Sequence, residues 1–219
     1  YKLSNSKTAN KELVNTLLTG KDENRIGLVG YGATVVPSAS ADLTKNSGEL
    51  NTIIDSWSTI SGTCICCGIN NATERFKQQS PLEKLKEMIV MSDGKASTKC
   101  KQQGTGDKNK DAIMAACDAN FTLQNLIIYS VGFGSDVEVS TMQQIAQCGN
   151  GKYFFADVGA ITDIYKDIAQ EIKKNSFISI QTFNYIKMIF YNETSLHEEM
   201  ITDIPKDIFE TKKYNFDLQ

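Results

Sequence analysis

The feature that most constrains the fold of this chain is a regular alternation of short apolar runs with segments of helical periodicity. Apolar runs bounded by turn residues predict buried strands at 25–31, 87–91, 126–131 and 152–156. Segments with apolar residues at helical spacing lie around these runs. Strands that alternate with helices are typical of an α/β fold, so we expect a doubly wound, mostly parallel sheet with helices on both faces.

Capping residues and apolar spacing locate the individual helices. We predict helices at 6–20, from Ser47 onward, and at 66–78, 107–119, 140–147 and 160–174. A brief edge strand is expected at 34–37. The connection at 95–106 is polar and is expected to be a loop.

The pattern changes after Asn175, where strand-like runs at 177–183, 187–191 and 214–218 follow one another without a clear helix, apart from a turn around 195–200. We therefore predict two parts, residues 1–175 as an α/β domain and 176–219 as a β-rich extension. This short extension has few apolar side chains and cannot form a core of its own. It is expected to be part of an incomplete β-sandwich.

Composition narrows the possible partners. The net charge is −3 and the basic residues are scattered, which disfavours a nucleic-acid partner. The longest apolar run, at 126–131, is far too short to span a bilayer. The sequence shows no signal peptide or membrane anchor, so either the protein is cytosolic or those segments lie outside this chain.

The six cysteines indicate an oxidising compartment, because an even number suits disulfide formation. Buried free thiols are the alternative interpretation. A structural zinc is disfavoured, since no second CxxC pair occurs at zinc spacing and the one histidine cannot complete a Cys/His site. Three N-x-Ser/Thr triplets give weak support for a surface location. The candidate disulfide cysteines are Cys64, Cys66, Cys67, Cys100, Cys117 and Cys148, and the candidate glycosylation sites are Asn71, Asn120 and Asn192.

Two short motifs carry groups that bind hard cations. Asp93, in MSDG, follows a buried strand, and ligands of open α/β sheets bind at the carboxyl ends of strands. Thr63, in SGTC, lies in a loop before a helix, where its hydroxyl could meet the same ion. Each residue has a purely structural alternative, because Asp93 can cap a turn and Thr63 can cap the helix.

The order of these segments resembles the von Willebrand factor A-type domain over residues 6–174. RIGLVGYG, SGTCICCGI, MIVMSDG, IIYSVGFG and GKYFFADV occur in the family's order and spacing. The GTCICCGIN loop further resembles a group of archaeal surface proteins with this domain.

The resemblance implies a metal-ion-dependent adhesion site. Members of the family bind a divalent ion, usually Mg²⁺, with Ca²⁺ and Mn²⁺ as alternatives here, through a threonine that matches Thr63 and an aspartate that matches Asp93. The ion's open position then takes a carboxylate from a partner protein. A disulfide from Cys64, Cys66 or Cys67 to Cys100 would tie the threonine loop to the segment after Asp93.

The sequence departs from the family in one respect, because the Asp-x-Ser-x-Ser motif of the first metal loop does not occur in it. The resemblance places the preceding strand in the centre of the sheet, between 26–31 and 88–91. Without that strand, two rows of backbone N–H and C=O groups would have no hydrogen-bond partners, which costs about 1–3 kcal/mol of stability for each buried group. We therefore expect this strand to come from upstream residues or from another chain.

The sequence thus predicts an extracellular or cell-surface module for metal-dependent protein binding and adhesion. The alternative is a structural subunit of a surface filament or envelope, completed by strands from a neighbouring copy or another chain. An enzyme is disfavoured, because His197 lies away from the strand ends and no nucleotide-binding motif follows a strand. Paired acid–base chemistry by Asp93 and Asp136 rests on loop position alone.

Overall fold

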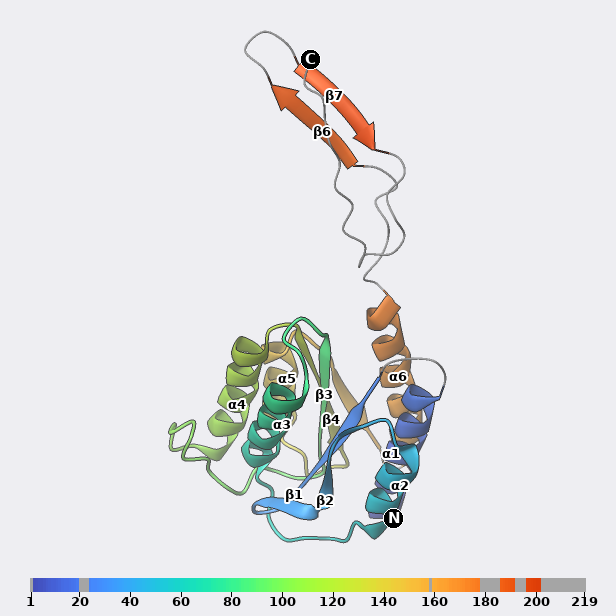
Figure 1. Cartoon of the computed structure of the whole chain (residues 1–219). Coiled ribbons are helices and arrows are strands. Elements are labelled where there is room, and N and C mark those ends of the chain that lie inside the picture. The colour runs from blue at the N-terminus through green and yellow to red at the C-terminus, as the bar shows by residue number, and fades with distance from the viewer. Residues whose placement is uncertain (1, 20–23, 158, 178–185, 192–195, 202–219) are drawn as a thin grey trace. The chain divides into compact units, whose positions relative to one another are not determined.

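The computed structural model describes residues 2–19, 24–157, 159–177, 186–191 and 196–201 (Figure 1). The chain divides into two compact units, Tyr1–Ser176 and Phe177–Gln219. The elements of the first unit are α1 (Lys2–Leu18), β1 (Ile26–Tyr31), β2 (Val35–Thr44), α2 (Ser47–Ser56), α3 (Ile65–Gln79), β3 (Lys86–Ser92), α4 (Lys108–Leu123), β4 (Leu126–Phe133), α5 (Val139–Cys148), β5 (Tyr153–Ala156) and α6 (Ile161–Phe177).

Three of these strands form a parallel sheet in the order β3-β4-β5. β3 runs beside β4 in unbroken register from Lys86 opposite Leu126 to Ser92 opposite Gly132. β5 then pairs with the second half of β4. The predicted α/β fold is confirmed. One pair departs from the parallel arrangement, since β1 and β2 form an antiparallel ribbon with two register shifts.

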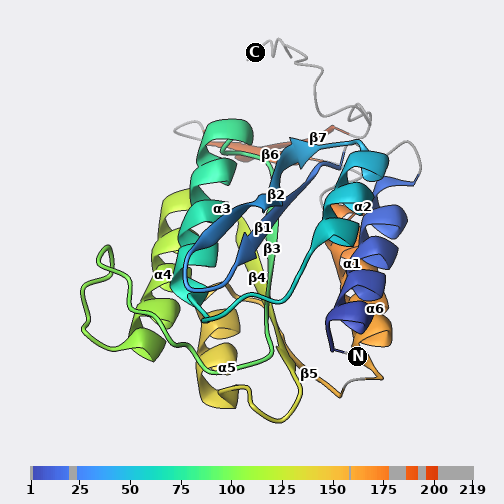
Figure 2. The same cartoon turned by 90° about the horizontal axis from the view of Figure 1, so that it is seen from below.

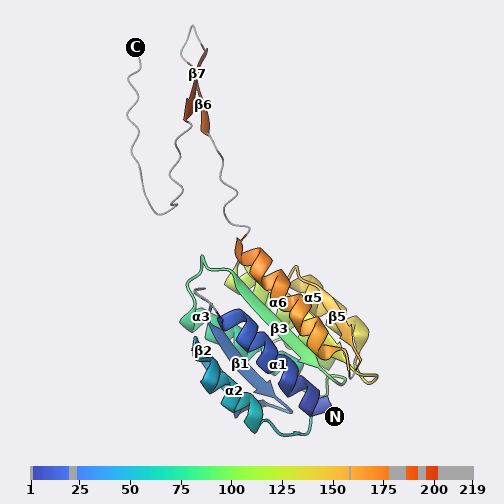
Figure 3. The ribbon, with the colours of Figure 1, turned by 90° about the vertical axis from the view of Figure 1, so that its right-hand side faces the viewer.

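Helices cover the parallel sheet on both faces, and β3 shows why. Its side chains alternate, so Met88 and Val90 pack with α3, α4 and α5. Ile89 and Met91 lie on the other side, against α1 and α6. Figures 2 and 3 show these two helical layers with the strands between them. β4 lies between β3 and β5, and nearly all of its side chains are buried.

Side-chain caps fix the starts of two helices. The Asn46 side chain accepts a hydrogen bond from the Glu49 amide at the start of α2 (3.0 Å). The Asp107 carboxylate accepts from the Asn109 and Lys110 amides at the start of α4, both at 2.9 Å. Asp107, the first residue of the helix predicted at 107–119, is therefore the N-cap of α4.

Several predicted boundaries in the first unit were wrong, and α4 ends at Leu123 rather than near residue 119. The first helix begins at Lys2 rather than at Ser6, and Ser6 is buried within it with its hydroxyl 3.8 Å from the Met91 sulfur. β2 extends to Thr44, well past the brief strand expected at 34–37. Its Pro37 and polar residues weaken the strand pattern, but pairing with β1 overrides that local preference.

In the second unit, β6 (Ile186–Tyr191) and β7 (Leu196–Ile201) pair antiparallel. β6 matches the strand predicted at 187–191. The turn expected around 195–200 was wrong, because Leu196–Ile201 is a strand. α6 ends at Phe177, so no strand begins there, and both the remainder of the run at 177–183 and the strand predicted at 214–218 lie outside the described residues.

A gap separates the antiparallel ribbon from the parallel sheet. Among the described strands, β1 is paired only with β2 and β3 only with β4. The Tyr31 phenol crosses this gap at one end and donates a hydrogen bond to the Met91 carbonyl (2.5 Å). A cavity of about 120 Å³ lies between the two strands and is lined by Gly27, Val29, Tyr31, Gly68, Ile69, Ala72, Phe76, Glu87, Met88, Ile89 and Val90.

Candidate functional site

Asp93 lies where the parallel sheet ends. β3 stops at Ser92, whose buried hydroxyl donates a hydrogen bond to the Gly94 carbonyl (2.9 Å) and closes a tight turn. This turn places Asp93 at the rim, where 60% of its side chain is exposed. A carboxylate in this position can reach an ion or a partner from solution.

Thr63 precedes Cys64, the N-cap residue of α3, and its loop is fixed from two sides. The Cys64 amide donates to the Gly32 carbonyl (2.6 Å), and the Ala33 amide donates to the Ser61 carbonyl (2.9 Å), which attaches the loop to the end of β1. Gly62 has a φ of +83° and approaches Ala33 so closely that a Cβ would lie 2.7 Å from the alanine Cβ. A residue with a side chain would therefore push the loop away.

The Thr63 loop is joined to the loop after Asp93 by a reciprocal pair of hydrogen bonds. The Thr63 amide donates to the Ser97 hydroxyl (2.7 Å), and the Ser97 amide donates to the Thr63 carbonyl (2.9 Å). A Cβ on Gly94 would lie 3.9 Å from Thr63 Oγ1, so the threonine hydroxyl borders the residue next to Asp93. The fold thus brings the two predicted ligand loops side by side.

Charged groups from two further segments surround Asp93. The Lys2 ammonium, at the start of α1, lies 4.0 Å from the Asp93 carboxylate and 3.6 Å from that of Asp136, which follows β4. Lys95 and Glu138 form a second ion pair at 3.9 Å. All of these side chains are at least one-third exposed, so the pairs stabilise the fold little. The three carboxylates exceed the two ammonium groups by one negative charge.

A hydroxyl and a carboxylate are suitable oxygen ligands for a hard divalent cation. Thr63 and Asp93 supply two of the roughly six oxygens that such an ion takes, so water and other groups must supply the rest. The two residues therefore fit part of a metal site. Lys2 and Ser97 were not among the predicted site residues, because only the fold brings the start of α1 and the polar loop to this edge.

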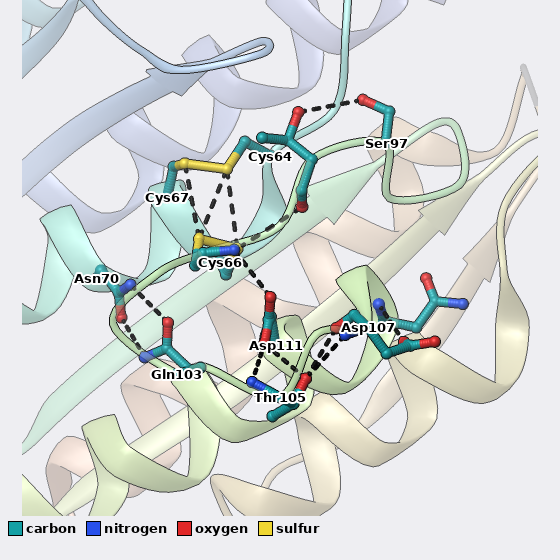
Figure 4. Close-up of a disulfide and its surroundings, with 12 residues drawn as sticks. Cys64, Cys66, Cys67, Asn70, Ser97, Gln103, Thr105, Asp107 and Asp111 are labelled. Atoms are coloured by element: carbon teal, nitrogen blue, oxygen red, sulfur yellow. Dashed lines mark hydrogen bonds between the residues drawn. A yellow bond between two sulfur atoms is a disulfide. The ribbon is translucent and has the colours of Figure 1, made fainter.

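The cysteines form three disulfides, Cys64–Cys67, Cys66–Cys100 and Cys117–Cys148. The Cys66–Cys100 bond joins the start of α3 to the polar loop after β3 (Figure 4). Cys117–Cys148 joins α4 to the end of α5. The Thr63 loop and the Asp93 loop are therefore connected both by hydrogen bonds and by a covalent link a few residues away.

Asp111 on α4 holds the second half of the polar loop. Its buried carboxylate accepts hydrogen bonds from the Cys100 amide (2.8 Å), the Thr105 amide (3.0 Å) and the Thr105 hydroxyl (2.6 Å). The Thr105 hydroxyl is the main cause of a lowered pKa of Asp111, because hydrogen bonds to the ionised form favour it.

The other predicted residues belong to other elements of the chain. Asn71, on α3, accepts a hydrogen bond from Arg75 (2.9 Å), and Asn120 lies on α4 beside the exposed Phe121. Asn192 is outside the described residues, and His197 lies on β7 in the second unit. Glycosylation at the three asparagines stays a prediction.

Among the helices that the structure describes, none combines the length and the apolar character that a bilayer span requires.

Comparisons with known proteins agree with this geometry. The family profile described as "von Willebrand factor type A domain" matches residues 1–176. No curated protein matches the chain.

Solved structures share the fold at low sequence identity. BatB from Bacteroides thetaiotaomicron, described as a conserved hypothetical protein, has a TM-score of 0.62 and 20% identity, over 80% of this chain and 88% of its own. The vWF domain of the type V pili tip protein Mfa5 from Porphyromonas gingivalis has a TM-score of 0.67 and 15% identity, over 82% and 91%. The mussel byssus protein PTMP1, with a zinc-occupied MIDAS motif, has a TM-score of 0.60 and 19% identity, over 77% and 42%.

Proposed function

Because the chain belongs to the von Willebrand factor type A domain family over residues 1–176, we propose that it is a protein-binding module of the cell surface rather than an enzyme. The proposed binding site is the rim formed by Thr63 and Asp93, where a divalent cation connects the domain to a carboxylate of its partner. The observation that carries this proposal is the juxtaposition of the two loops through the Thr63–Ser97 hydrogen bonds.

The chemistry of the rim supports a cation as the connecting group. Thr63 offers a neutral hydroxyl and Asp93 a single negative charge, so an ion held by these two residues keeps most of its positive charge for a partner. When bound, the cation supplies a coordination position for a carboxylate oxygen. Thr63 and Asp93 would hold and orient the cation, and the hydrogen bonds of Ser97 fix the Thr63 loop beside the loop after Asp93.

Two structural relatives carry descriptions that agree with this function. Mfa5 is a pili tip protein, and PTMP1 belongs to the mussel byssus and has zinc in its MIDAS motif. The second description shows that a domain of this fold accepts a divalent ion. For the present chain we propose Mg²⁺, with Ca²⁺ and Mn²⁺ as alternatives, because all three take oxygen ligands.

The proposal is tested by calorimetric titration of the full-length protein with Mg²⁺. Asp93→Asn removes the charged ligand and should weaken binding by about tenfold or more, since even supporting partners of a metal site contribute about 10–100-fold. Asp163→Asn is the matched control, because Asp163 is also exposed and also faces a lysine, Lys166, at 3.6 Å. Equal affinities of the Asp93 and Asp163 variants would contradict the proposal.

A second candidate function is that of a subunit in a surface filament or envelope. It is favoured by the gap between β1 and β3, where two strand edges face a cavity of about 120 Å³. An added strand would pair with both edges, by the mode in which one chain completes the sheet of another. We propose that a strand from upstream residues or from another chain occupies this gap and completes the cation site.

Hydrogen exchange and light scattering distinguish the two sources of this strand. If another chain supplies it, the β3 amides that face the gap exchange rapidly in dilute monomer and become protected on assembly. Protection of the same amides in a monomer at every concentration would assign the strand to the protein's own chain. That result would remove the structural basis for the filament function.

A further inference from the structure

Four sulfur atoms gather at the start of α3. The Sγ atoms of Cys64, Cys66, Cys67 and Cys100 all lie within 4.8 Å of one another, although Cys100 is far away in the sequence. Cys64 and Cys66 are inaccessible to solvent, Cys100 is nearly so, and Cys67 is partly exposed. Figure 4 shows the two disulfides of this sulfur cluster in contact with each other.

The spacing between the two disulfides matches that of a tetrahedral metal site. The Cys100 sulfur lies 3.7 Å from those of Cys64 and Cys67, and the Cys64 and Cys66 sulfurs are 3.8 Å apart. Four thiolates around zinc at about 2.3 Å define a tetrahedron with edges of about 3.8 Å. Three of the six sulfur–sulfur distances therefore have the required value already.

Zinc binding requires a longer sulfur–sulfur distance within each of the two disulfides. On reduction, this distance has to increase from the covalent value of about 2.05 Å to about 3.8 Å, a shift of under 2 Å. Rotation of cysteine side chains about χ1 covers such a distance without moving the backbone. Zinc is the suitable metal for this donor set, because it accepts four sulfur ligands in tetrahedral geometry.

Hydrogen bonds hold the four residues together independently of the disulfides. The side-chain amides of Asn70 and Gln103 bond each other reciprocally, at 3.0 and 3.1 Å, and connect α3 to the loop that carries Cys100. Asp111 binds the Cys100 amide at 2.8 Å. The Thr63–Ser97 pair closes the other end of the loop. Cys100 therefore remains beside α3 when the covalent bonds are broken.

The local charge also suits a tetrathiolate complex, which carries a net charge of −2. Cys64 is the N-cap residue of α3, so the free amides of the first helical turn, at 65–67, lie beside the cluster. The positive end of a helix stabilises negative charge. Lys99 and Lys101 flank Cys100 in the sequence and lie exposed next to it.

We propose that the sulfur cluster is a zinc site in the reduced protein. Two equivalents of a dithiol reductant supply four electrons and four protons, which converts the two disulfides into four thiols and oxidises the reductant to two disulfides. One Zn²⁺ then replaces the four thiol protons, which pass to solvent, and forms four zinc–sulfur bonds. The oxidised and the zinc-bound forms connect the same two loops, so Thr63 stays tied to the loop after Asp93 in both redox states.

Cobalt is the probe for this site, because Co²⁺ takes the tetrahedral geometry of zinc and absorbs light when thiolates bind it. The full chain is reduced under anaerobic conditions with an excess of a phosphine, which adds no thiolate ligands of its own, and is titrated with Co²⁺ and then with Zn²⁺. We expect one equivalent of Co²⁺ to produce thiolate-to-cobalt charge-transfer absorption and one equivalent of Zn²⁺ to abolish it. Reduced protein that shows no such absorption overturns the proposal.

Paired variants assign the ligands. Cys66→Ala/Cys100→Ala should lower cobalt affinity by more than the about 10–100-fold that loss of a supporting partner costs. Cys117→Ala/Cys148→Ala, the matched control, removes the other long-range disulfide and should bind cobalt like the wild type. Asp93→Asn should leave the charge-transfer band unchanged, which separates the sulfur site from the oxygen site at the rim.

Folding of each variant is checked by circular dichroism before titration. If the Cys66/Cys100 variant is unfolded, Cys67→Ala replaces it, since it removes one partly exposed ligand and leaves the buried ones in place. A weaker or shifted cobalt spectrum in that variant supports the site. The same spectrum and affinity as in the wild type would show that the cluster is not the ligand set.

Discussion

The disulfide pairing at the start of α3 gives a quantitative prediction, because its two bonds close loops of very different length. Cys64–Cys67 spans 3 residues along the chain, whereas Cys66–Cys100 spans 34. In the chain-entropy treatment, a loop of the first size stabilises the folded state by about 2 kcal/mol and one of the second size by about 4 kcal/mol. Replacing each pair by alanine should therefore have unequal effects.

The tested quantity is the difference between the two double variants. Cys64→Ala/Cys67→Ala and Cys66→Ala/Cys100→Ala each remove two mostly buried sulfur atoms, so their packing losses are similar. The second variant should be less stable than the first by about 2 kcal/mol. Urea unfolding without reductant measures this, and fluorescence of Trp57, the single tryptophan, reports on the first unit.

The refuting result follows from the closeness of the four sulfurs. Cys100 lies 3.7 Å from both Cys64 and Cys67, so a native bond from Cys100 to either of them is sterically accessible. In that case the Cys64/Cys67 variant also breaks a long loop and loses about 4 kcal/mol. Equal free energies of unfolding for the two variants would therefore contradict the pairing and the reasoning based on it.

Three further predictions concern single side chains, all measured by urea unfolding. Asp111→Ala leaves two amides of the loop at 100–105 unpaired and should cost about 2–6 kcal/mol, at about 1–3 kcal/mol for each amide. The lowered pKa of Asp111 adds a pH dependence. The stabilisation by the ionised Asp111 carboxylate is complete above the unfolded pKa of about 3.9 and is lost as pH falls through the lower folded value. Between roughly pH 5 and 2, the variant should therefore lose less stability than the wild type does. Tyr31→Phe removes the hydrogen bond to the Met91 carbonyl and should cost about 0.5–1.5 kcal/mol, and an unchanged midpoint would show that this bond contributes nothing. Gly62→Ala introduces a Cβ at a φ of +83°. It should cost at least about 1–2 kcal/mol, and a neutral effect would contradict the described loop conformation.

Much of the first unit could be predicted from the sequence, because its strands are buried on both faces and have continuous apolar runs. The run at 126–131 predicts β4 for this reason. β2 could not be predicted at its full length, since Pro37 and the polar residues after it have low strand propensity. Pairing with β1 stabilises the strand, and that pairing is a long-range effect absent from any local pattern.

The candidate site could be predicted in part for a similar reason. Asp93 and Thr63 lie in motifs that stand out locally, at a strand end and before a helix. Ser97 and Lys2 have no local feature that marks them, because their roles arise when the loop folds back on Thr63 and α1 begins beside Asp93. The sequence-based argument against zinc depended on spacing along the chain, whereas the sulfur cluster is completed by Cys100 from a distant loop.

The central claim is that one divalent cation is held at the sheet edge by oxygen atoms of Thr63 and Asp93. It is tested most directly by anomalous diffraction from crystals of the full-length protein grown with Mn²⁺. The account predicts an anomalous peak within about 2.0–2.6 Å of Thr63 Oγ1 and of an Asp93 carboxylate oxygen. A Mn²⁺ peak that contacts neither side chain would contradict the claim. The claim would also be contradicted if the crystals showed no Mn²⁺ peak at this edge and the protein still bound its partner after chelation.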